Sequence, residues 1–544
     1  MLDKLNKNIF KNLFFSIIFI LLSVYRFNWS LLALWGEDQA TNLWLGYVEP
    51  ISELNVGLIS SQLIPNPNGM MVLGKLLSLL GSTLTISIFL TILNLFILYL
   101  FLSNFFVKKS FDFYLLFLFS GLSVLISSTT IEFWNQWILL TINLLIMNFI
   151  FRYINNNKVS NLYILILLIP LPVSVYLGGL TNTLVFGLIL LFLVFKDYKK
   201  NNFNLLSLGI FTFPVISVYW LFSFKQFFNA VSFSRLTSLN SLSVFDRAKY
   251  FLNNLLKLPD GLLNTWNKDE KFVIFQTDVV IINDSTEQIL ELFYQFHKII
   301  PLFAVLAFSY GLFKVITKSE SLNTFIHLKK TNLIIFFISF SLVLSPIYGG
   351  PDFLIIQEKS NNLNQYYLFF ILFWYLLPLS INNFHKNSKI LTFNRLLFSI
   401  FIIINLTLGI QILNDHKSFE EIKATSIEAP IRDKIKVVDF ISEEWKNENN
   451  ARELSIKYDT FVTELDWFDD LSRELSEYYN STPYTEGRVF DYELLRQYNL
   501  VNIFNEYDEP NFIVTNIFDS EPKFDEKVLN HYKFGRLRVS KINK

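Results

Sequence analysis

The sequence predicts a polytopic α-helical membrane protein with about eleven transmembrane helices and a small C-terminal α/β domain. Hydrophobic residues make up 52% of the chain and charged residues only 17%, below the roughly 25% usual for soluble domains. The apolar residues gather into runs that approach the roughly 20 residues needed to cross a bilayer. The charged residues gather in the loops and in the segment after residue 412.

Apolar runs of spanning or near-spanning length occur at 9–27, 84–106, 113–130, 137–151, 161–178, 181–195, 204–224, 298–317, 331–348, 366–383 and 390–412. The first run follows a lysine-rich start but precedes no small-residue cleavage site, so we expect an uncleaved first helix. Between 161 and 195, Gly178, Gly179 and Thr181 mark either a turn between two spans or a break in one bent helix.

Charge in the short loops predicts the orientation. Lysine and arginine occupy one alternating set of loops and acidic residues the other, and basic loops mark the cytoplasmic side. We expect a cytoplasmic N-terminus, an extracytoplasmic C-terminus and residence in the plasma membrane. Three outer segments are then large: the first loop (28–83), the central loop (225–297) and the tail (413–544). The chain divides into a membrane domain (1–412) and a soluble domain (413–544).

The tail has the pattern of a small α/β domain. Residues 431–446 carry apolar residues at helical spacing. Short β-rich runs follow at 454–458, 512–517 and 537–542, with a helical stretch at 491–498.

Composition also excludes several kinds of site. The chain contains no cysteine, which excludes disulfides, thiolate metal ligands and cysteine nucleophiles. The five histidines are scattered, and no spacing predicts a metal site. The net charge of zero gives no sign of nucleic-acid binding.

The first outer loop is the most informative segment. It begins with two adjacent carboxylates, Glu37 and Asp38, directly after the first span, where ionisable groups are costly unless they are paired or used. Downstream, Pro65-Asn66-Pro67-Asn68 precedes an amphipathic stretch at 70–81 that contains Lys75. This stretch is too short to span the bilayer, so we expect it to lie along the membrane interface.

This loop resembles the GT-C glycosyltransferases, most closely the protein O-mannosyltransferase and lipid A aminoarabinose transferase branch. The resemblance rests on Glu37-Asp38-Gln39 and on the Asn-Pro turn, and it covers the whole chain in architecture but only 30–82 in motif. The chain departs from the pattern where Asn68 replaces a second proline, and where Gln365-Tyr366-Tyr367 replaces an Arg-Tyr pair. These departures leave a non-catalytic member open.

The resemblance implies an inverting transfer of a sugar from a polyprenyl-phosphate donor to an envelope glycan, lipid or protein. Asp38 matches the family's general base, with Glu37 as the alternative, and Glu132 and Gln39 would line the acceptor cavity. Lys75, or else Lys359, would hold the donor phosphate. No cofactor is expected, although a divalent cation stays open.

Each of these residues also has a structural explanation that requires no role in catalysis or binding. Asp38 equally suits the cap of a following helix, and Lys75 suits a lysine whose stem lies on the interface and whose charge reaches the head groups. Lys359 suits a solvated pair with Glu358, and Glu132 suits an aromatic belt residue beside Trp134.

Two other functions stay open for the whole chain. One is a transporter or flippase of lipid-linked saccharides, which usually shows internal repeats and charged or broken helices near the midplane. The other is a non-catalytic envelope-assembly protein on the same scaffold.

Overall fold

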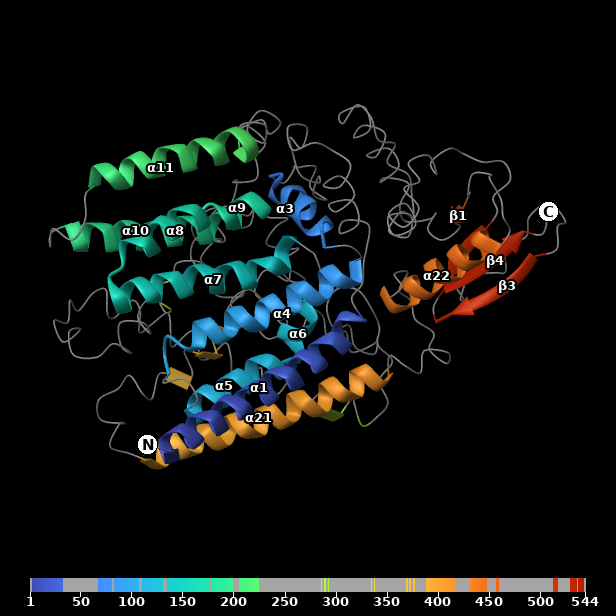
Figure 1. The fold of residues 1–544 in the computed structure, drawn as a ribbon, viewed down its shortest axis with the longest axis horizontal. Coiled ribbons are helices and arrows are strands. Elements are labelled where there is room, and N and C mark those ends of the chain that lie inside the picture. The colour runs from blue at the N-terminus through green and yellow to red at the C-terminus, as the bar shows by residue number, and fades with distance from the viewer. Residues whose placement is uncertain are drawn as a thin grey trace, which may run out of the picture.

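The computed structural model describes residues 2–32, 67–80, 83–106, 110–130, 135–176, 179–198, 205–224, 388–415, 431–447, 456–458, 512–516, 529–535 and 537–542, with twelve separate positions between 285 and 376. This part of the chain is mostly helical and ends in a small sheet (Figure 1).

Four of the described helices are long and apolar enough to cross a membrane. Their apolar segments are Asn12–Ser30, Leu84–Leu102, Ile138–Asn156 and Thr392–Asn414. They belong to α1 (Leu2–Ser30), α4 (Thr83–Leu102), α7 (Asn135–Asn156) and α21 (Ser388–Asp415). The expectation of a polytopic helical membrane protein is confirmed at this coarse level.

Shorter apolar helices fill the remaining described runs. They are α5 (Phe111–Leu122), α6 (Val124–Thr130), α8 (Val159–Leu168), α9 (Leu171–Val175), α10 (Leu180–Tyr198) and α11 (Leu205–Tyr219), which continues into the π-helix η2 (Trp220–Phe224). The run at 298–317 lies outside the described residues, and only a few positions of 331–348 and 366–383 are described. The count of eleven therefore stays a prediction.

Two expected spans are broken helices. The run at 113–130 divides at Ser123, whose extended backbone separates α5 from α6. The run at 161–178 divides at Pro170, because proline has no N–H to donate and begins the new helix α9 instead. Near Gly179 the chain turns between α9 and α10, where Thr183 Oγ1 donates to Ile169 O at 3.0 Å, so a turn and not a bend is correct there.

The helices α1 and α5 run in the same direction. Phe14, in the middle of α1, lies beside Tyr114 at the start of α5, with ring centroids 5.3 Å apart, and near the C-termini of both helices Arg26 Nε donates to Gly121 O at 2.8 Å. The eleventh expected span, α21, also runs parallel to α5 and α6: Arg395 bonds Asp112 near one end, and Asn405 bonds Val124 further along. Spans one, three and eleven are codirectional in any alternating topology that contains them.

In the described part of the C-terminal segment, a four-stranded sheet packs against α22 (Ile431–Asn447). The strands are β1 (Ile456–Tyr458), β2 (Phe512–Asn516), β3 (Leu529–Phe534) and β4 (Leu537–Ile542), in the order β1-β2-β4-β3. The β1–β2 pair is parallel and the other pairs are antiparallel. The expected helix and three expected strands are confirmed, β3 was not predicted, and the stretch at 491–498 lies outside the described residues.

Alternation along the hairpin places one face of the sheet against α22. Phe440 of α22 packs on Tyr532 and Phe534, with ring centroids 4.5 Å and 5.1 Å away, and Lys541 pairs with Glu444. Gly535, in the turn between β3 and β4, has a φ of 60°, a conformation that favours glycine.

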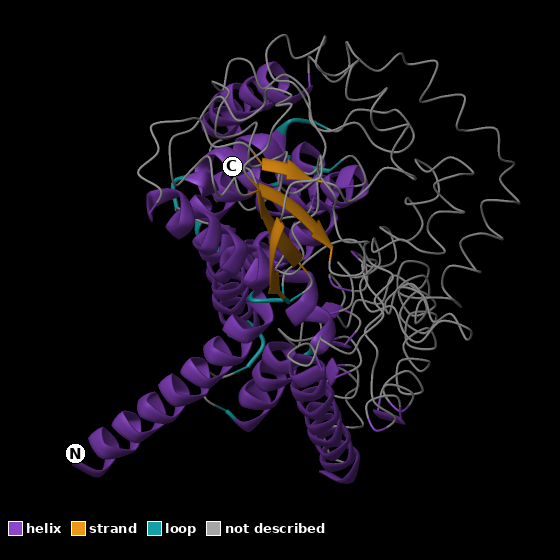
Figure 2. Cartoon of the chain, turned by 90° about the vertical axis from the view of Figure 1, so that its right-hand side faces the viewer, coloured by secondary structure: helices purple, strands orange, loops and turns teal. Residues whose placement is uncertain are grey.

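The sheet lies beyond the end of the bundle at which α1 ends (Figures 1 and 2). A backbone hydrogen bond joins the two parts: Arg432 N, in the first turn of α22, donates to Leu31 O at 3.3 Å. We call this the sheet end of the bundle. The other end, where α5 begins at Phe111 and α7 ends at Asn156, we call the opposite end.

Candidate functional site at the sheet end of the bundle

Most of the site residues predicted from the sequence lie outside the described part of the chain. These are Glu37, Asp38, Gln39, Glu132 and Lys359. Lys75 lies inside it, on α3 (Gly69–Ser78), so the predicted short helix is present, and its placement along the membrane interface stays a prediction. The residues that flank the acidic segments, however, are described, and they can be followed to their contacts.

The Asn-Pro turn is held tightly against α9. Pro67 and Asn68 are buried, and α3 begins directly after them. A Cβ on Gly69 would collide with the backbone carbonyl of Ser174 in α9. Only glycine permits so close an approach, so this position needs glycine for packing.

The helix α3 has the two faces expected of an interfacial helix. Met70, Met71 and Leu77 are buried against the bundle, whereas Leu76 and Leu79 are 58% and 82% exposed. Lys75 is half-buried between these faces and is the only charged residue of the helix. At 10 residues, α3 is about 15 Å long, half of the hydrocarbon core, so it does not span.

The break between α5 and α6 is stabilised by side chains from α1 and α21. Helix termini leave backbone carbonyls and N–H groups without helical partners. Arg26 donates from Nη2 to Ser120 O and from Nε to Gly121 O, at 2.9 Å and 2.8 Å. Tyr25 Oη donates to Leu122 O at 3.2 Å, so two adjacent residues of α1 bond the last three carbonyls of α5.

The other side of the break is satisfied from α21. Val124 N, at the start of α6, donates to Asn405 Oδ1 at 3.1 Å. Ser123 Oγ accepts from Ile126 N at 3.4 Å, which is a local cap within the broken helix itself. Broken helices persist at membrane depth only where protein groups satisfy the freed backbone, and here α1, α21 and the Ser123 side chain contribute.

Arg26 also reaches across the break to α6. Its Nη1 donates to Ile126 O at 3.1 Å and to Thr130 Oγ1 at 2.7 Å. The side chain is fully buried, and among the described residues no carboxylate forms an ion pair with it. A buried guanidinium is tolerated here because carbonyl dipoles and a hydroxyl accept its hydrogen bonds.

These contacts bring the starts of two acidic segments together. Arg26 lies about one turn before the end of α1 at Ser30, after which the sequence continues to Glu37 and Asp38. Thr130 is the last residue of α6, and Glu132 follows it by two positions. The first turn of α22 contacts Leu31 at the same end. The described ends of α1 and α6 and the first turn of α22 therefore lie at the same end of the bundle.

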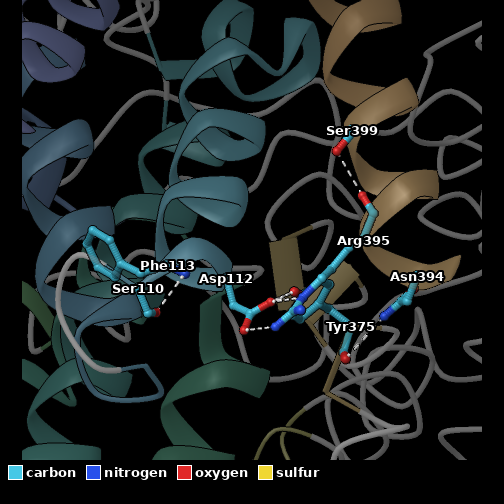
Figure 3. A network of polar contacts seen from close by, with 7 residues as sticks. All are labelled: Ser110, Asp112, Phe113, Tyr375, Asn394, Arg395 and Ser399. Atoms are coloured by element: carbon cyan, nitrogen blue, oxygen red, sulfur yellow. Dashed lines mark hydrogen bonds and ion pairs between the residues drawn. The ribbon is translucent and has the colours of Figure 1, made fainter. Parts of the chain in front are cut away.

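A second polar network lies at the opposite end of the bundle (Figure 3). Arg395 of α21 holds Asp112 of α5 with two hydrogen bonds, Nε to Oδ1 and Nη2 to Oδ2, both 2.8 Å long. Tyr375 Oη also donates to Asp112, and Ser110 Oγ caps α5 by accepting from Phe113 N at 3.3 Å. The Arg395 guanidinium stacks over Phe111, so the network ties three segments together.

Sequence reasoning missed Arg26 and Asp112. Arg26 carries a signal that could have been used, because an arginine at the end of an apolar run is costly in lipid and points to a partner inside the bundle. Asp112 had no such signal, since an acidic residue in the first turn of a helix is commonplace. Its partner Arg395 is 283 positions away in the sequence.

Among the described residues, no group of three or more acidic or histidine side chains is placed to hold a metal ion. No protein-family model matches this chain, and no curated protein is significantly similar to it.

Proposed function

We propose that the protein is an inverting glycosyltransferase that moves a sugar from a polyprenyl-phosphate donor to an envelope glycan, lipid or protein at the outer face of the plasma membrane. One observation carries the proposal: the end of α1, the end of α6 and the first turn of α22 meet at one end of the bundle, and the sequence continues from α1 to Glu37 and Asp38 and from α6 to Glu132. The helix α3, which carries the half-buried Lys75, packs on α9.

The chemistry divides between an acid–base group and a cation. Asp38, or Glu37 in its place, would take the proton from the acceptor hydroxyl or amine as that atom bonds to the anomeric carbon. The bond from this carbon to the phosphate oxygen breaks in the same step, which inverts the configuration. Lys75 would stabilise the negative charge that develops on the departing polyprenyl phosphate.

The two different faces of α3 support this role for Lys75. Its helix exposes Leu76 and Leu79 and buries the opposite face, so its charge would lie near the depth of lipid head groups. Lys359 is the second candidate for the same role, and Glu132 and Gln39 are proposed for the acceptor side. The proposal requires no metal, and EDTA treatment tests whether a divalent cation takes part.

The decisive experiment is a transfer assay on the full chain in nanodiscs. The probes are radiolabelled polyprenyl-phosphate hexoses and pentoses with an envelope extract as the acceptor source. We expect Asp38→Asn to lower kcat by at least about 100-fold, because a positioned general base contributes roughly 10² to 10⁴. Asp439→Asn, on the exposed face of α22, is the matched control and should leave kcat unchanged.

Other outcomes separate the alternatives. Full activity in Asp38→Asn with loss in Glu37→Gln would move the base to Glu37. Movement of the intact lipid-linked sugar across vesicles, without formation of a glycosidic bond, would favour the transporter. The broken helices at Ser123 and Pro170 are the observation that keeps this second function in view. Donor binding with neither transfer nor movement would favour the non-catalytic assembly protein.

A further inference from the structure

Arg26 joins the last part of α1 to both halves of the broken helix. Its Nε and Nη2 hold carbonyls at the end of α5, and its Nη1 holds Ile126 and Thr130 of α6. One side chain therefore makes four hydrogen bonds to two helices, all of them buried. Hydrogen bonds from a charged donor are about twice as strong as neutral ones, so these four bonds hold the three helices together more strongly than four neutral bonds would.

The helix α6 depends on such outside support. It has only seven residues, too few for stable helix formation without tertiary contacts. At its C-terminal end, Thr130 contacts Arg26, and this contact links the end of α6 to α1. Removal of Arg26 would take a hydrogen-bond donor from the carbonyls of Ser120 and Gly121 in an apolar interior, which is costly.

We propose that Arg26 is a positioning residue. By clamping Thr130 of α6 to α1, it fixes the separation between the starting points of the two segments that carry Glu37, Asp38 and Glu132. An effect of Arg26 on catalysis depends on the proposed transferase function. The stabilisation of α6 by Arg26 does not depend on that function. Arg26 itself is fully buried and touches no substrate.

The positions of the four acceptors around residue 26 explain why arginine, and not lysine, suits this position. The guanidinium presents donors in a planar fork, and its three nitrogens reach two carbonyls of α5, one carbonyl of α6 and a hydroxyl. Lysine would keep the charge, but its single nitrogen cannot reach both sides of the break in the same way. Arg26→Lys should therefore restore part of the positioning, and Arg26→Met none of it.

The first test measures how accessible α6 is to a thiol reagent. Because the chain has no cysteine, Ser127→Cys gives a single reporter thiol in α6, at a side chain that is fully buried. We expect a water-soluble maleimide to label it at least about tenfold faster in Arg26→Met than in the parent, with Arg26→Lys between them. A matched reporter at Ser174→Cys in α9, also buried, should keep its labelling rate.

The control variant is Arg152→Met, an arginine of α7 that stacks over Phe149 and makes no contact with the break. If Arg26→Met accelerates both reporters equally, the residue stabilises the whole bundle and the positioning role is wrong. Unchanged labelling of Ser127→Cys would overturn the proposal as well. Acceleration at Ser127→Cys alone supports it.

The second test adds the transfer assay in the same nanodiscs. We expect Arg26→Met to lower kcat at least about tenfold with little change in the KM for donor, and Arg26→Lys to recover part of it. If α6 opens in Arg26→Met but the parent shows no transfer, the transferase proposal fails and the hold on α6 stands. If kcat falls while the Ser127 reporter stays protected, the positioning role fails and the transferase proposal stands.

Discussion

At the scale of single residues, the described polar side chains are placed by the backbone groups that they satisfy. Arg26 and Tyr25 bond carbonyls that a helix break leaves open, and Asn405 bonds a freed N–H. In an apolar interior an unsatisfied backbone group costs roughly 1 to 3 kcal/mol, so these residues are as necessary to the fold as the apolar core. Asp112 instead forms an ion pair with Arg395, which lies beside it across the α5–α21 contact.

Replacement of Asp112 by asparagine tests the second network. The change removes the charge that two hydrogen bonds from Arg395 and one from Tyr375 engage. Because Arg395 is 34% exposed, solvent screens part of the loss, and we expect a destabilisation of about 1 to 2 kcal/mol. Reversible unfolding in mixed micelles measures it.

The matched control is Asp439→Asn, an exposed acidic residue of α22. It should change the free energy of unfolding by less than about 0.5 kcal/mol. Equal effects of the two substitutions would show that the Asp112–Arg395 pair contributes no stability.

At the scale of elements, α3 is held in place by small residues and proline. The turn before it ends in Gly69, whose backbone lies against Ser174, and Gly179 lies as closely against Pro172. Two glycines thus allow α3, α9 and the start of α10 to pack with their backbones in close approach. The exposed Leu76 and Leu79 are left for the membrane interface.

Gly69→Ala tests this packing. A methyl group at Gly69 meets backbone atoms, which cannot rotate away, so we expect α3 to shift and the protein to lose about 1 to 3 kcal/mol of stability. Gly187→Ala in α10 is the matched control, since a Cβ there meets nothing within 4 Å. That change should be neutral or stabilise by up to about 1 kcal/mol, because alanine favours a helix. A tolerated Gly69→Ala would show that α3 is loosely held.

At the scale of the whole molecule, three described helices run in the same direction, toward the C-terminal sheet (Figure 1). The parallel course of α1, α5 and α21 leaves the C-terminal end of α21 at the sheet end, from which the chain reaches α22. The hydrogen bond from Arg432 to Leu31 keeps the soluble domain beside the end of α1. Which side of the membrane this end faces is predicted from the basic loops.

Cysteine labelling in intact cells tests the topology. Asn530 in β3 and Asn157 between α7 and α8 are both exposed, one in the soluble domain and one at the opposite end of the bundle. We expect a membrane-impermeant maleimide to label Asn530→Cys and to spare Asn157→Cys until the cells are permeabilised. Labelling of Asn157→Cys alone would reverse the orientation, and labelling of both would contradict a bundle that spans the membrane.

The sequence by itself determined the elements whose signal is local. Apolar length gave the spans α1, α4, α7 and α21, and helical spacing gave α3 and α22, because burial in lipid or against a sheet imposes a pattern on neighbouring residues. It gave Lys75 its place on an interfacial helix, while its other candidates, Glu37, Asp38, Gln39, Glu132 and Lys359, stay predictions.

Only the tertiary structure decided what depends on distant partners. Ser123 breaks a span that reads as continuous, and the break is stable because Arg26 lies about 95 positions before it and Asn405 about 280 positions after it. The strand β3 has the sequence LNHYKF, which mixes polar and apolar residues, and its pairing with β4 defines it more than its own pattern does. Backbone groups in an apolar medium must be satisfied by whatever lies beside them, and neighbours in space are not written in local sequence.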